Sequence, residues 1–214
     1  MKRISIWFPL ITAAFMMTAA CSSPTKENAP PVIAETTAPA IQTATASVTP
    51  SPVLPTEQPL PFSVSSSGIV KDVIQDAYGA RAEQKRGGIP SRSFPLAFLG
   101  VPENTACLAL AMIDPDGGDW VHWLAVDLPV TGLSENASID LASDLIQGKN
   151  DFGFTGYGGP TPPSGTHTYI VTVYALSGSV TLENGFSLEE FHQAIDDKIL
   201  ETAEVRGDYS HELK

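Results

Sequence analysis

Two histidines, a tyrosine and two aspartates are the residues most suited to chemistry in this sequence. Asp114 and Asp116 follow one apolar run, and His122 lies near the start of the next. His167 and Tyr169 are two residues apart, so they would share one face of an extended strand. Imidazole, phenol and carboxylate groups can together bind a small ligand or transfer protons. These five side chains therefore form the candidate site.

A segment rich in glycine and proline leads directly to His167. Residues 150–165 contain five glycines and three prolines. Glycine lets the backbone approach a ligand closely, and backbone N–H groups in such turns can bind anions. Carboxylates beside imidazoles favour the imidazolium form, so we expect charged histidines that bind a phosphate or carboxylate. In an alternative interpretation, His122 and His167 only hydrogen-bond the aspartates and hold loops together.

Three apolar segments are predicted to be the strands that position these residues. They span residues 105–113, 121–128 and 169–176, and each is bounded by proline or glycine. The first two would form a hairpin with the candidate residues at one end. Their nearly continuous apolar character indicates strands that are covered on both faces. Cys107 lies within the first segment and is interpreted as a small buried hydrophobic residue.

One helix is predicted near the C-terminus. Ser187 and Glu190 have the spacing of a capping box, and apolar residues continue at helical spacing as far as Ile199. We expect this helix to pack on the sheet. His192 lies off the apolar stripe and His211 lies in a polar tail, so neither histidine is expected to bind a ligand.

The composition limits the classes of function. The chain has 12 basic and 24 acidic residues, a net charge of −12, which makes nucleic acid a poor partner. Two cysteines cannot form a disulfide framework or a four-cysteine zinc site, and the common zinc-protease and P-loop motifs are missing. We therefore predict no metal and no cofactor. No nucleophile with an evident base occurs, so an enzyme is not expected.

The sequence divides into three parts. Residues 1–20 have a charged start and an apolar stretch, as is typical of a signal peptide, and small residues precede Cys21. This arrangement resembles the processing site of bacterial lipoproteins, which implies a lipidated Cys21; the alternative is ordinary secretion with a free thiol. Residues 21–61 are rich in Pro, Thr and Ala and are predicted to be a disordered linker. The folded domain is expected to span residues 62–214.

Six blocks, in order, resemble the phosphatidylethanolamine-binding protein family, also called Raf kinase inhibitor-like, and particularly its bacterial branch. The blocks are V-P-E-N-T (101–105), D-P-D (114–116), V-H-W (121–123), G-K-N-D-F-G (148–153), G-Y-G-G-P followed by P-P (156–163) and H-T-Y (167–169). They extend over nearly the whole domain. The resemblance implies a mainly β fold, in which a large central sheet packs against a smaller antiparallel sheet, with a helix near the C-terminus.

The resemblance also implies a pocket for a small anion and no cofactor. The family's ligand-binding positions carry over to Asp114, Trp120, His122, Gly159, Pro162, His167 and Tyr169, with Asp116 in a supporting role. Relatives usually have arginine at the position of Thr168. We therefore expect this chain to bind extended anionic ligands more weakly than those relatives do.

These observations predict an extracytoplasmic binding module that is anchored to the bacterial cell membrane through lipidated Cys21. Its expected ligand is phosphate, a phospholipid head group or a similar small anion. The alternative is an inhibitor or regulator of an envelope protease or of another protein partner, a role that the family is sometimes given. No segment of the sequence is recognisable as an inhibitory loop.

Overall fold

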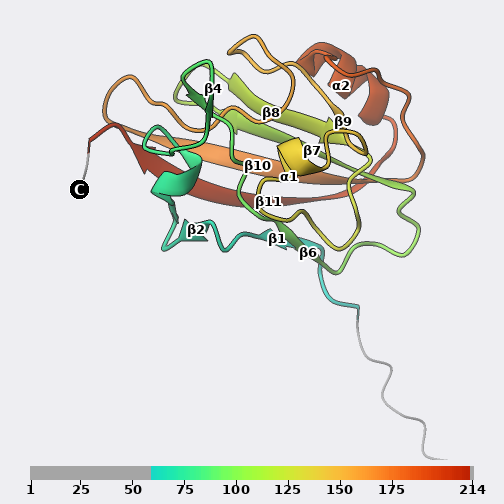
Figure 1. The fold of residues 1–214 in the computed structure, drawn as a ribbon. Coiled ribbons are helices and arrows are strands. Elements are labelled where there is room, and N and C mark those ends of the chain that lie inside the picture. Colours follow the sequence, from blue (N-terminus) through green and yellow to red (C-terminus); the bar gives the residue numbers. More distant parts are fainter. Residues whose placement is uncertain (1–58, 213–214) are drawn as a thin grey trace, which may run out of the picture. The chain divides into compact units, whose positions relative to one another are not determined.

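The computed structural model describes residues 59–212 (Figure 1). The predicted signal segment, Cys21 and the linker up to residue 58 lie outside these residues. In the described part, no helix is long and apolar enough to span a membrane. The elements, in chain order, are β1 (Ser63–Ser65), β2 (Ile69–Val70), β3 (Val73–Ile74), the 3₁₀ helix η1 (Asp76–Tyr78), β4 (Lys85–Arg86), β5 (Ile89–Pro90), β6 (Ala97–Leu99), β7 (Cys107–Asp114), β8 (Trp120–Val126), α1 (Ala137–Asp140), β9 (Ile146–Gln147), β10 (Thr166–Leu176), α2 (Leu188–Ile195) and β11 (Ile199–Ser210).

A seven-stranded mixed sheet forms the centre of the domain. Its strand order is β2-β3-β11-β10-β7-β8-β9, and all neighbours are antiparallel except β3 and β11. Two small two-stranded antiparallel sheets, β1-β6 and β4-β5, accompany it. The three predicted strands correspond to β7, β8 and β10, and β7 and β8 form the predicted hairpin.

The central strands are covered on both faces. Along β7, side chains point alternately into two hydrophobic clusters, and Cys107 is buried in one of them, as its sequence context predicts. Val64 and Phe98 of the small sheet β1-β6 pack in the first cluster, whereas Phe191 and Ile195 of α2 pack in the second. The expectation of a large sheet packed against a smaller antiparallel one is therefore confirmed.

Helix α2 begins as predicted but ends earlier. The Ser187 hydroxyl accepts a hydrogen bond from the Glu190 N–H, and the Glu190 carboxylate accepts one from the Ser187 N–H, so the capping box is present. The helix ends at Ile195, and the prediction that it includes Ile199 is wrong. The Lys198 N–H donates to the Ile195 carbonyl in a turn, after which Ile199 begins β11. Pairing with β10 thus overrides the helical spacing.

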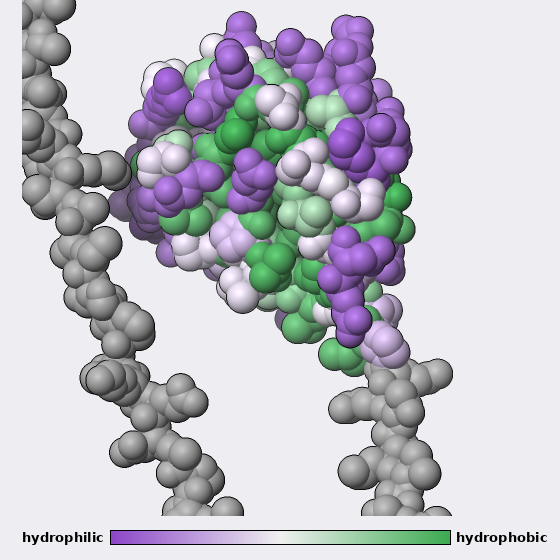
Figure 2. Space-filling view, turned by 90° about the vertical axis from the view of Figure 1, so that its right-hand side faces the viewer, coloured by the Kyte–Doolittle hydropathy of each residue, from purple (hydrophilic) through white to green (hydrophobic). Residues whose placement is uncertain are grey.

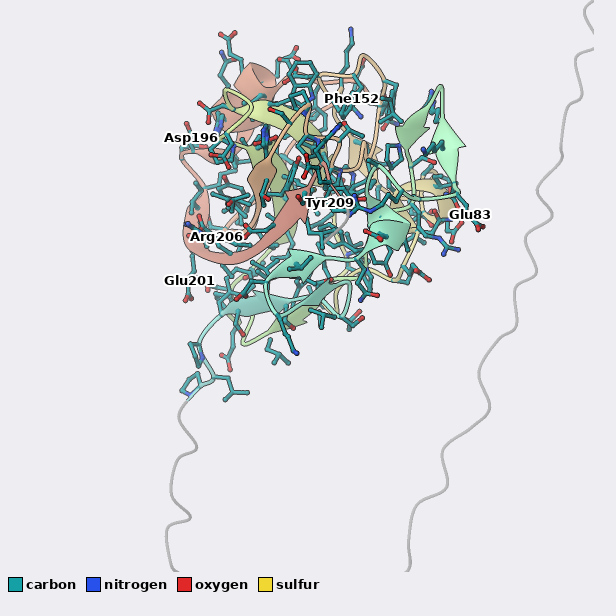
Figure 3. All side chains as sticks on the ribbon, turned by 90° about the vertical axis from the view of Figure 1, so that its left-hand side faces the viewer. Glu83, Phe152, Asp196, Glu201, Arg206 and Tyr209 are labelled. Carbon is teal, nitrogen blue, oxygen red and sulfur yellow. The ribbon has the colours of Figure 1, made fainter. Side chains whose placement is uncertain are left out.

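The segment that leads to His211, expected in a polar tail, is β11, the longest described strand. It pairs with β10 from Ile199 to Ser210. Tyr209 is buried, whereas Arg206 points away from the body of the domain (Figure 3). A side chain at position 207 would place its Cβ 2.7 Å from Ile74 Cγ1, which explains the glycine there. This strand brings the C-terminal end of the domain to the edge that carries the candidate site.

The surface of the domain mixes polar and apolar residues. On the face in Figure 2, hydrophobic residues gather in the centre and lower part, and hydrophilic residues border them above. Leu60, which precedes β1, and Leu99 of β6 are large apolar side chains that remain exposed near the small sheet β1-β6. Single exposed apolar residues are common on protein surfaces, so they do not by themselves indicate a binding site.

Candidate functional site

Three strand ends meet at one edge of the central sheet. Asp114 ends β7, Trp120 begins β8, and His167 and Tyr169 lie at the start of β10. Because β10 runs antiparallel to β7, its beginning lies beside the end of β7, where Ile170 pairs with Ile113. The register therefore brings together residues that are more than 50 positions apart in the sequence.

A β-bulge directs His122 toward the same face as Asp114. Met112 pairs with Trp123 but Ile113 pairs with Val121, so His122 is an extra residue in β8. As a consequence, Val121 and Trp123 lie on opposite faces of the sheet: Val121 packs in the second hydrophobic cluster and Trp123 in the first. Bulges commonly redirect a side chain next to a binding site. Without this one, strict alternation would place His122 on the opposite face from Trp123.

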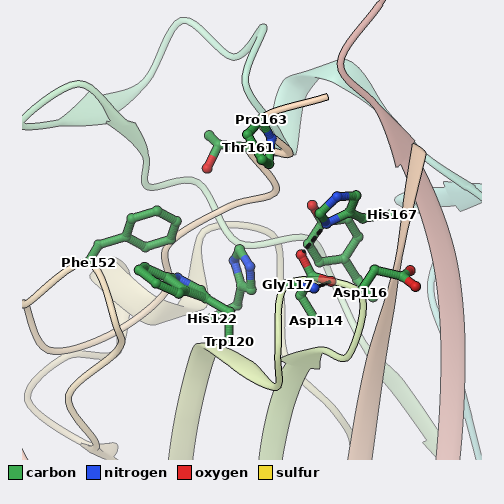
Figure 4. A pocket seen from close by; sticks show the side chains of 10 residues that line it. Asp114, Asp116, Gly117, Trp120, His122, Phe152, Thr161, Pro163 and His167 are labelled. Carbon is green, nitrogen blue, oxygen red and sulfur yellow. Dashed lines mark hydrogen bonds and ion pairs between the residues drawn. The ribbon is translucent and has the colours of Figure 1, made fainter. Parts of the chain in front are cut away.

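These side chains line a cavity of about 460 Å³ (Figure 4). Its lining residues are Asp114, Asp116, Gly117, Trp120, His122, Phe152, Thr161, Pro163, His167 and Tyr169. The rings of Trp120 and Phe152 meet edge to face with centroids 5.6 Å apart, and the His122 ring lies 5.4 Å from that of Phe152. The cavity thus has an aromatic side and a side that carries carboxylates.

Two of the residues that the resemblance placed in the pocket do not line it. Gly159 donates its N–H to the Pro90 carbonyl. A Cβ at this position would collide with the Tyr78 carbonyl oxygen, so glycine is needed there for packing. Pro162 turns its carbonyl toward His211, while its neighbours Thr161 and Pro163 face the cavity. Proline and glycine in this loop shape the wall, but the loop residues that face the cavity are Thr161 and Pro163 rather than Gly159 and Pro162.

Phe152 is the most important lining residue that the sequence reasoning did not identify. It was part of the block at residues 148–153, but an aromatic residue in a glycine-rich loop has no fixed direction. The Asp151 carboxylate fixes this loop by accepting a hydrogen bond from the Val121 N–H at 2.7 Å. Phe154 then stacks on Phe152 with centroids 6.3 Å apart. The flanking Asp151 was a possible signal that the loop is attached to a strand.

Asp114 and His167 form a largely buried pair. The His167 Nδ1 lies 2.8 Å from Asp114 Oδ2, and their side chains are 14% and 6% exposed. Asp114 Oδ1 accepts a hydrogen bond from the Gly117 N–H at 2.9 Å. The Asp116 carboxylate has a different partner, because its Oδ2 accepts a hydrogen bond from the Thr168 N–H at 2.8 Å. The two aspartates therefore hold the turn after β7 against the start of β10.

His122 is neutral, contrary to the expectation of a charged imidazolium. Burial lowers its pKa to about 4, and this effect outweighs the Gly158 carbonyl and the carboxylates of Asp114 and Asp151, which act in the opposite direction. The His122 Nδ1 lies 2.5 Å from the Gly158 carbonyl oxygen. Since a carbonyl can only accept, Nδ1 carries the proton and Nε2 presents a lone pair. His122 is therefore a hydrogen-bond acceptor at neutral pH.

Tyr169 provides a donor beside Asp114. Its hydroxyl is buried and makes no hydrogen bond of standard geometry with the described residues, although the Asp114 carboxylate lies within reach of it. Burial first, and the nearby Asp114 carboxylate second, through its charge and through a hydrogen-bonding contact, raise the pKa of Tyr169, so the hydroxyl keeps its proton. Its ring meets that of His122 edge to face at 5.0 Å. A buried polar group without a partner is costly, which favours a ligand that accepts this hydrogen bond.

The cavity wall offers the Tyr169 hydroxyl as a donor, the His122 Nε2 as an acceptor and two carboxylates, together with the Trp120 indole, the Thr161 hydroxyl and the His167 ring. The residues that line the cavity include neither lysine nor arginine. In residues 59–212, no group of three or more His, Cys, Asp or Glu side chains is suited to hold a metal ion. These groups are suited to hydrogen bonding with a small polar molecule that has both an acceptor and a donor.

The comparisons with known proteins agree with this architecture. A family model described as phosphatidylethanolamine-binding protein matches residues 64–210. The chain is 37% identical to the uncharacterized protein YxkA of Bacillus subtilis over 147 residues, which cover 59% of this chain and 88% of that protein. It is 41% identical to a UPF0098 protein of Methanothermobacter thermautotrophicus over 138 residues, which cover 58% of this chain and 91% of that protein.

Two solved structures share the fold at a TM-score of 0.61. One is a putative phosphatidylethanolamine-binding protein homolog, CT736, from Chlamydia trachomatis, with 32% identity; 71% of this chain and 98% of that chain are covered. The other is YbcL of E. coli, described as a new member of the mammalian family, with 31% identity; 72% of this chain and 99% of that chain are covered. With its fold, its cavity and a family match over most of its length, this chain belongs to the phosphatidylethanolamine-binding protein family.

Proposed function

We propose that the cavity binds a small, partly protonated oxyanion, such as inorganic phosphate or a phosphate monoester of the head-group type, for example phosphoethanolamine. The observation that carries this proposal is the placement, on one cavity wall, of the buried Tyr169 hydroxyl, which is a donor, beside the His122 ring, whose Nε2 lone pair is an acceptor. The domain then acts as an extracytoplasmic binding module, and lipidated Cys21 anchors it to the membrane.

The protonation state of the ligand follows from these two groups. An oxygen of the ligand accepts from the Tyr169 hydroxyl, and a P–O–H group donates to the His122 Nε2. A dianion has no proton to donate, and it is also repelled by the carboxylates of Asp114 and Asp116. Since the second pKa of a phosphate monoester is about 6, the monoanion is available at mildly acidic and neutral pH.

The aromatic side of the cavity favours a ligand with an organic part. Trp120, Phe152 and Pro163 form an apolar wall opposite the carboxylates. An ammonium group beside an aromatic face gains a cation–π interaction, and the Asp116 carboxylate adds an attraction of the same sign. A zwitterionic head group such as phosphoethanolamine is therefore expected to bind more tightly than inorganic phosphate.

The proposed site binds its ligand without converting it. The residues that line the cavity include no serine or cysteine. Cys107 packs in the second hydrophobic cluster, and burial raises the pKa of its thiol to about 11, so it is a poor nucleophile. These features favour a binding module over an enzyme.

A titration tests the proposal. The full chain is titrated with inorganic phosphate, with phosphoethanolamine and with ethanolamine, and binding is followed by calorimetry and by NMR of the Gly117 and Thr168 amides. Tyr169→Phe is expected to weaken phosphoethanolamine binding about tenfold, because one hydrogen bond to a charged ligand is lost. His192→Ala, on the exposed side of α2, is the matched control and should bind as the wild type does.

Three outcomes bear on the proposal. Binding by the wild type and the control, with a loss in Tyr169→Phe, supports it. Equal binding by all three chains would show that the ligand does not occupy this cavity. If none of the three compounds binds, the head-group proposal is wrong, and recovery of an envelope protease with the wild type would then favour the regulatory alternative.

A further inference from the structure

The loop that forms one rim of the cavity has few hydrogen bonds of its own. Residues 160–165 supply the lining residues Thr161 and Pro163. Three of these six residues are prolines, which have no N–H to donate. Upstream, the loop is attached where the Gly159 N–H donates to the Pro90 carbonyl. A rim of this kind depends on contacts from elsewhere in the domain for its position.

His211 provides such a contact. Its Nδ1 lies 3.0 Å from the Pro162 carbonyl oxygen, and because a carbonyl only accepts, Nδ1 is the donor. Within the described residues, it is the only hydrogen bond made by residues 160–164. It falls between Thr161 and Pro163, the two residues of the loop that face the cavity.

The backbone of β11 fixes the position of His211. Its N–H donates to the Gly165 carbonyl at 2.8 Å, and Ser210 pairs with Thr166 at the last position of the β10-β11 ladder. The Thr166 and Ser210 hydroxyl oxygens also lie 3.2 Å apart. The His211 imidazole therefore projects from the end of the long β10-β11 ladder. This ladder gives a stable attachment point to a loop that has few hydrogen bonds of its own.

We propose that His211 is a positioning residue that holds the Pro162 carbonyl and thereby fixes the rim formed by Thr161 and Pro163. The effect on the ligand rests on the function proposed above, whereas the effect on the loop does not. The sequence predicted no role for His211, because it took the segment around His211 for a polar tail. Both neutral His211 with its proton on Nδ1 and the imidazolium can donate this hydrogen bond.

The test compares three variants of the full chain. His211→Ala removes the donor. His211→Asn keeps one, because the asparagine amide nitrogen occupies nearly the same position relative to the backbone as histidine Nδ1. His192→Ala removes an exposed histidine of α2 and serves as the control. Two quantities are measured: the order parameters of the Thr161 and Ser164 amides without ligand, and the dissociation constant for phosphoethanolamine.

His211→Ala is expected to lower the order parameters of Thr161 and Ser164 and to weaken phosphoethanolamine binding about threefold to tenfold, the equivalent of one net hydrogen bond. His211→Asn should restore both quantities, and His192→Ala should change neither. Unchanged order parameters in His211→Ala would overturn the positioning role, even if the wild type binds the ligand.

The two proposals can fail separately. If the wild type does not bind phosphoethanolamine but His211→Ala still loosens the loop and His211→Asn restores it, His211 positions the rim and the proposed ligand is wrong. If His211→Ala and His211→Asn both weaken binding equally with a rigid loop, the positioning role is wrong and the binding site stands.

Discussion

The neutral state of His122 predicts a specific dependence of stability on pH. The pKa of His122 is about 4 in the folded domain and 6.5 at its ordinary value, which applies to the unfolded chain. Below pH 6.5 the unfolded chain takes up a proton that the folded domain does not. Acid therefore favours unfolding, and the stability due to this group is lost as the pH falls from 6.5 to about 4.

The magnitude follows from the difference between the two pKa values. Each pKa unit corresponds to about 1.4 kcal/mol, so the fall from 6.5 to about 4 removes about 3 kcal/mol from the free energy of unfolding. A domain of this size is stable by about 5–15 kcal/mol, so it should remain folded while this loss is measured. Below the folded pKa, both states carry the proton, and the contribution of His122 levels off.

A variant isolates the contribution of this one residue. His122→Asn keeps a donor for the Gly158 carbonyl but does not titrate. Urea unfolding of both chains is measured from pH 4 to pH 8 in buffers without phosphate, so that no ligand contributes. The wild type should lose about 3 kcal/mol more than the variant over this range. A constant difference between the two chains at every pH would refute the assignment of a buried neutral His122.

Three further substitutions test other parts of the structure. Phe152→Leu keeps apolar bulk but removes an aromatic face, so it should weaken phosphoethanolamine binding a few fold while inorganic phosphate binding stays the same in calorimetry. Ser187→Ala removes the capping box and should cost about 1 kcal/mol in urea unfolding, with ligand binding unchanged. Gln147→Leu leaves the buried Trp123 Nε1–H and the Ser138 hydroxyl without their shared acceptor, which should cost about 2–4 kcal/mol by the same measurement. Losses below about 0.5 kcal/mol in either unfolding experiment would contradict the hydrogen bonds described here.

The elements that the sequence predicts are those whose own residues determine their structure. The long apolar runs of β7, β8 and β10 must be buried on two faces, and the capping box of α2 is a local interaction. Strand β11 was missed because many of its side chains are polar and exposed. Its structure depends on the ladder with β10, and such a pairing is not visible in a local window of the sequence.

The candidate site was predictable in composition but not in geometry. Asp114 and His167 were expected together because both flank strand ends, and their pairing follows from the antiparallel register. The position of Phe152 depends on the contact between Asp151 and Val121, which are 30 residues apart. The charge of His122 depends on how deeply packing buries it. Burial is a property of the whole fold, so residue types alone predicted the opposite charge.

One extra residue in β8 links the fold to the protonation of the ligand. The bulge places His122 between the Phe152 and Tyr169 rings, where burial outweighs the attraction of the carboxylates for a proton. The same position brings Nδ1 to the Gly158 carbonyl, which commits the only proton of the neutral ring to the protein. Nε2 must then accept, so the proton of the hydrogen bond between His122 and a bound oxyanion has to come from the ligand. Under the function proposed above, a cavity built in this way selects the protonated form of a phosphate, whereas a histidine beside two aspartates suggests a site that brings its own positive charge.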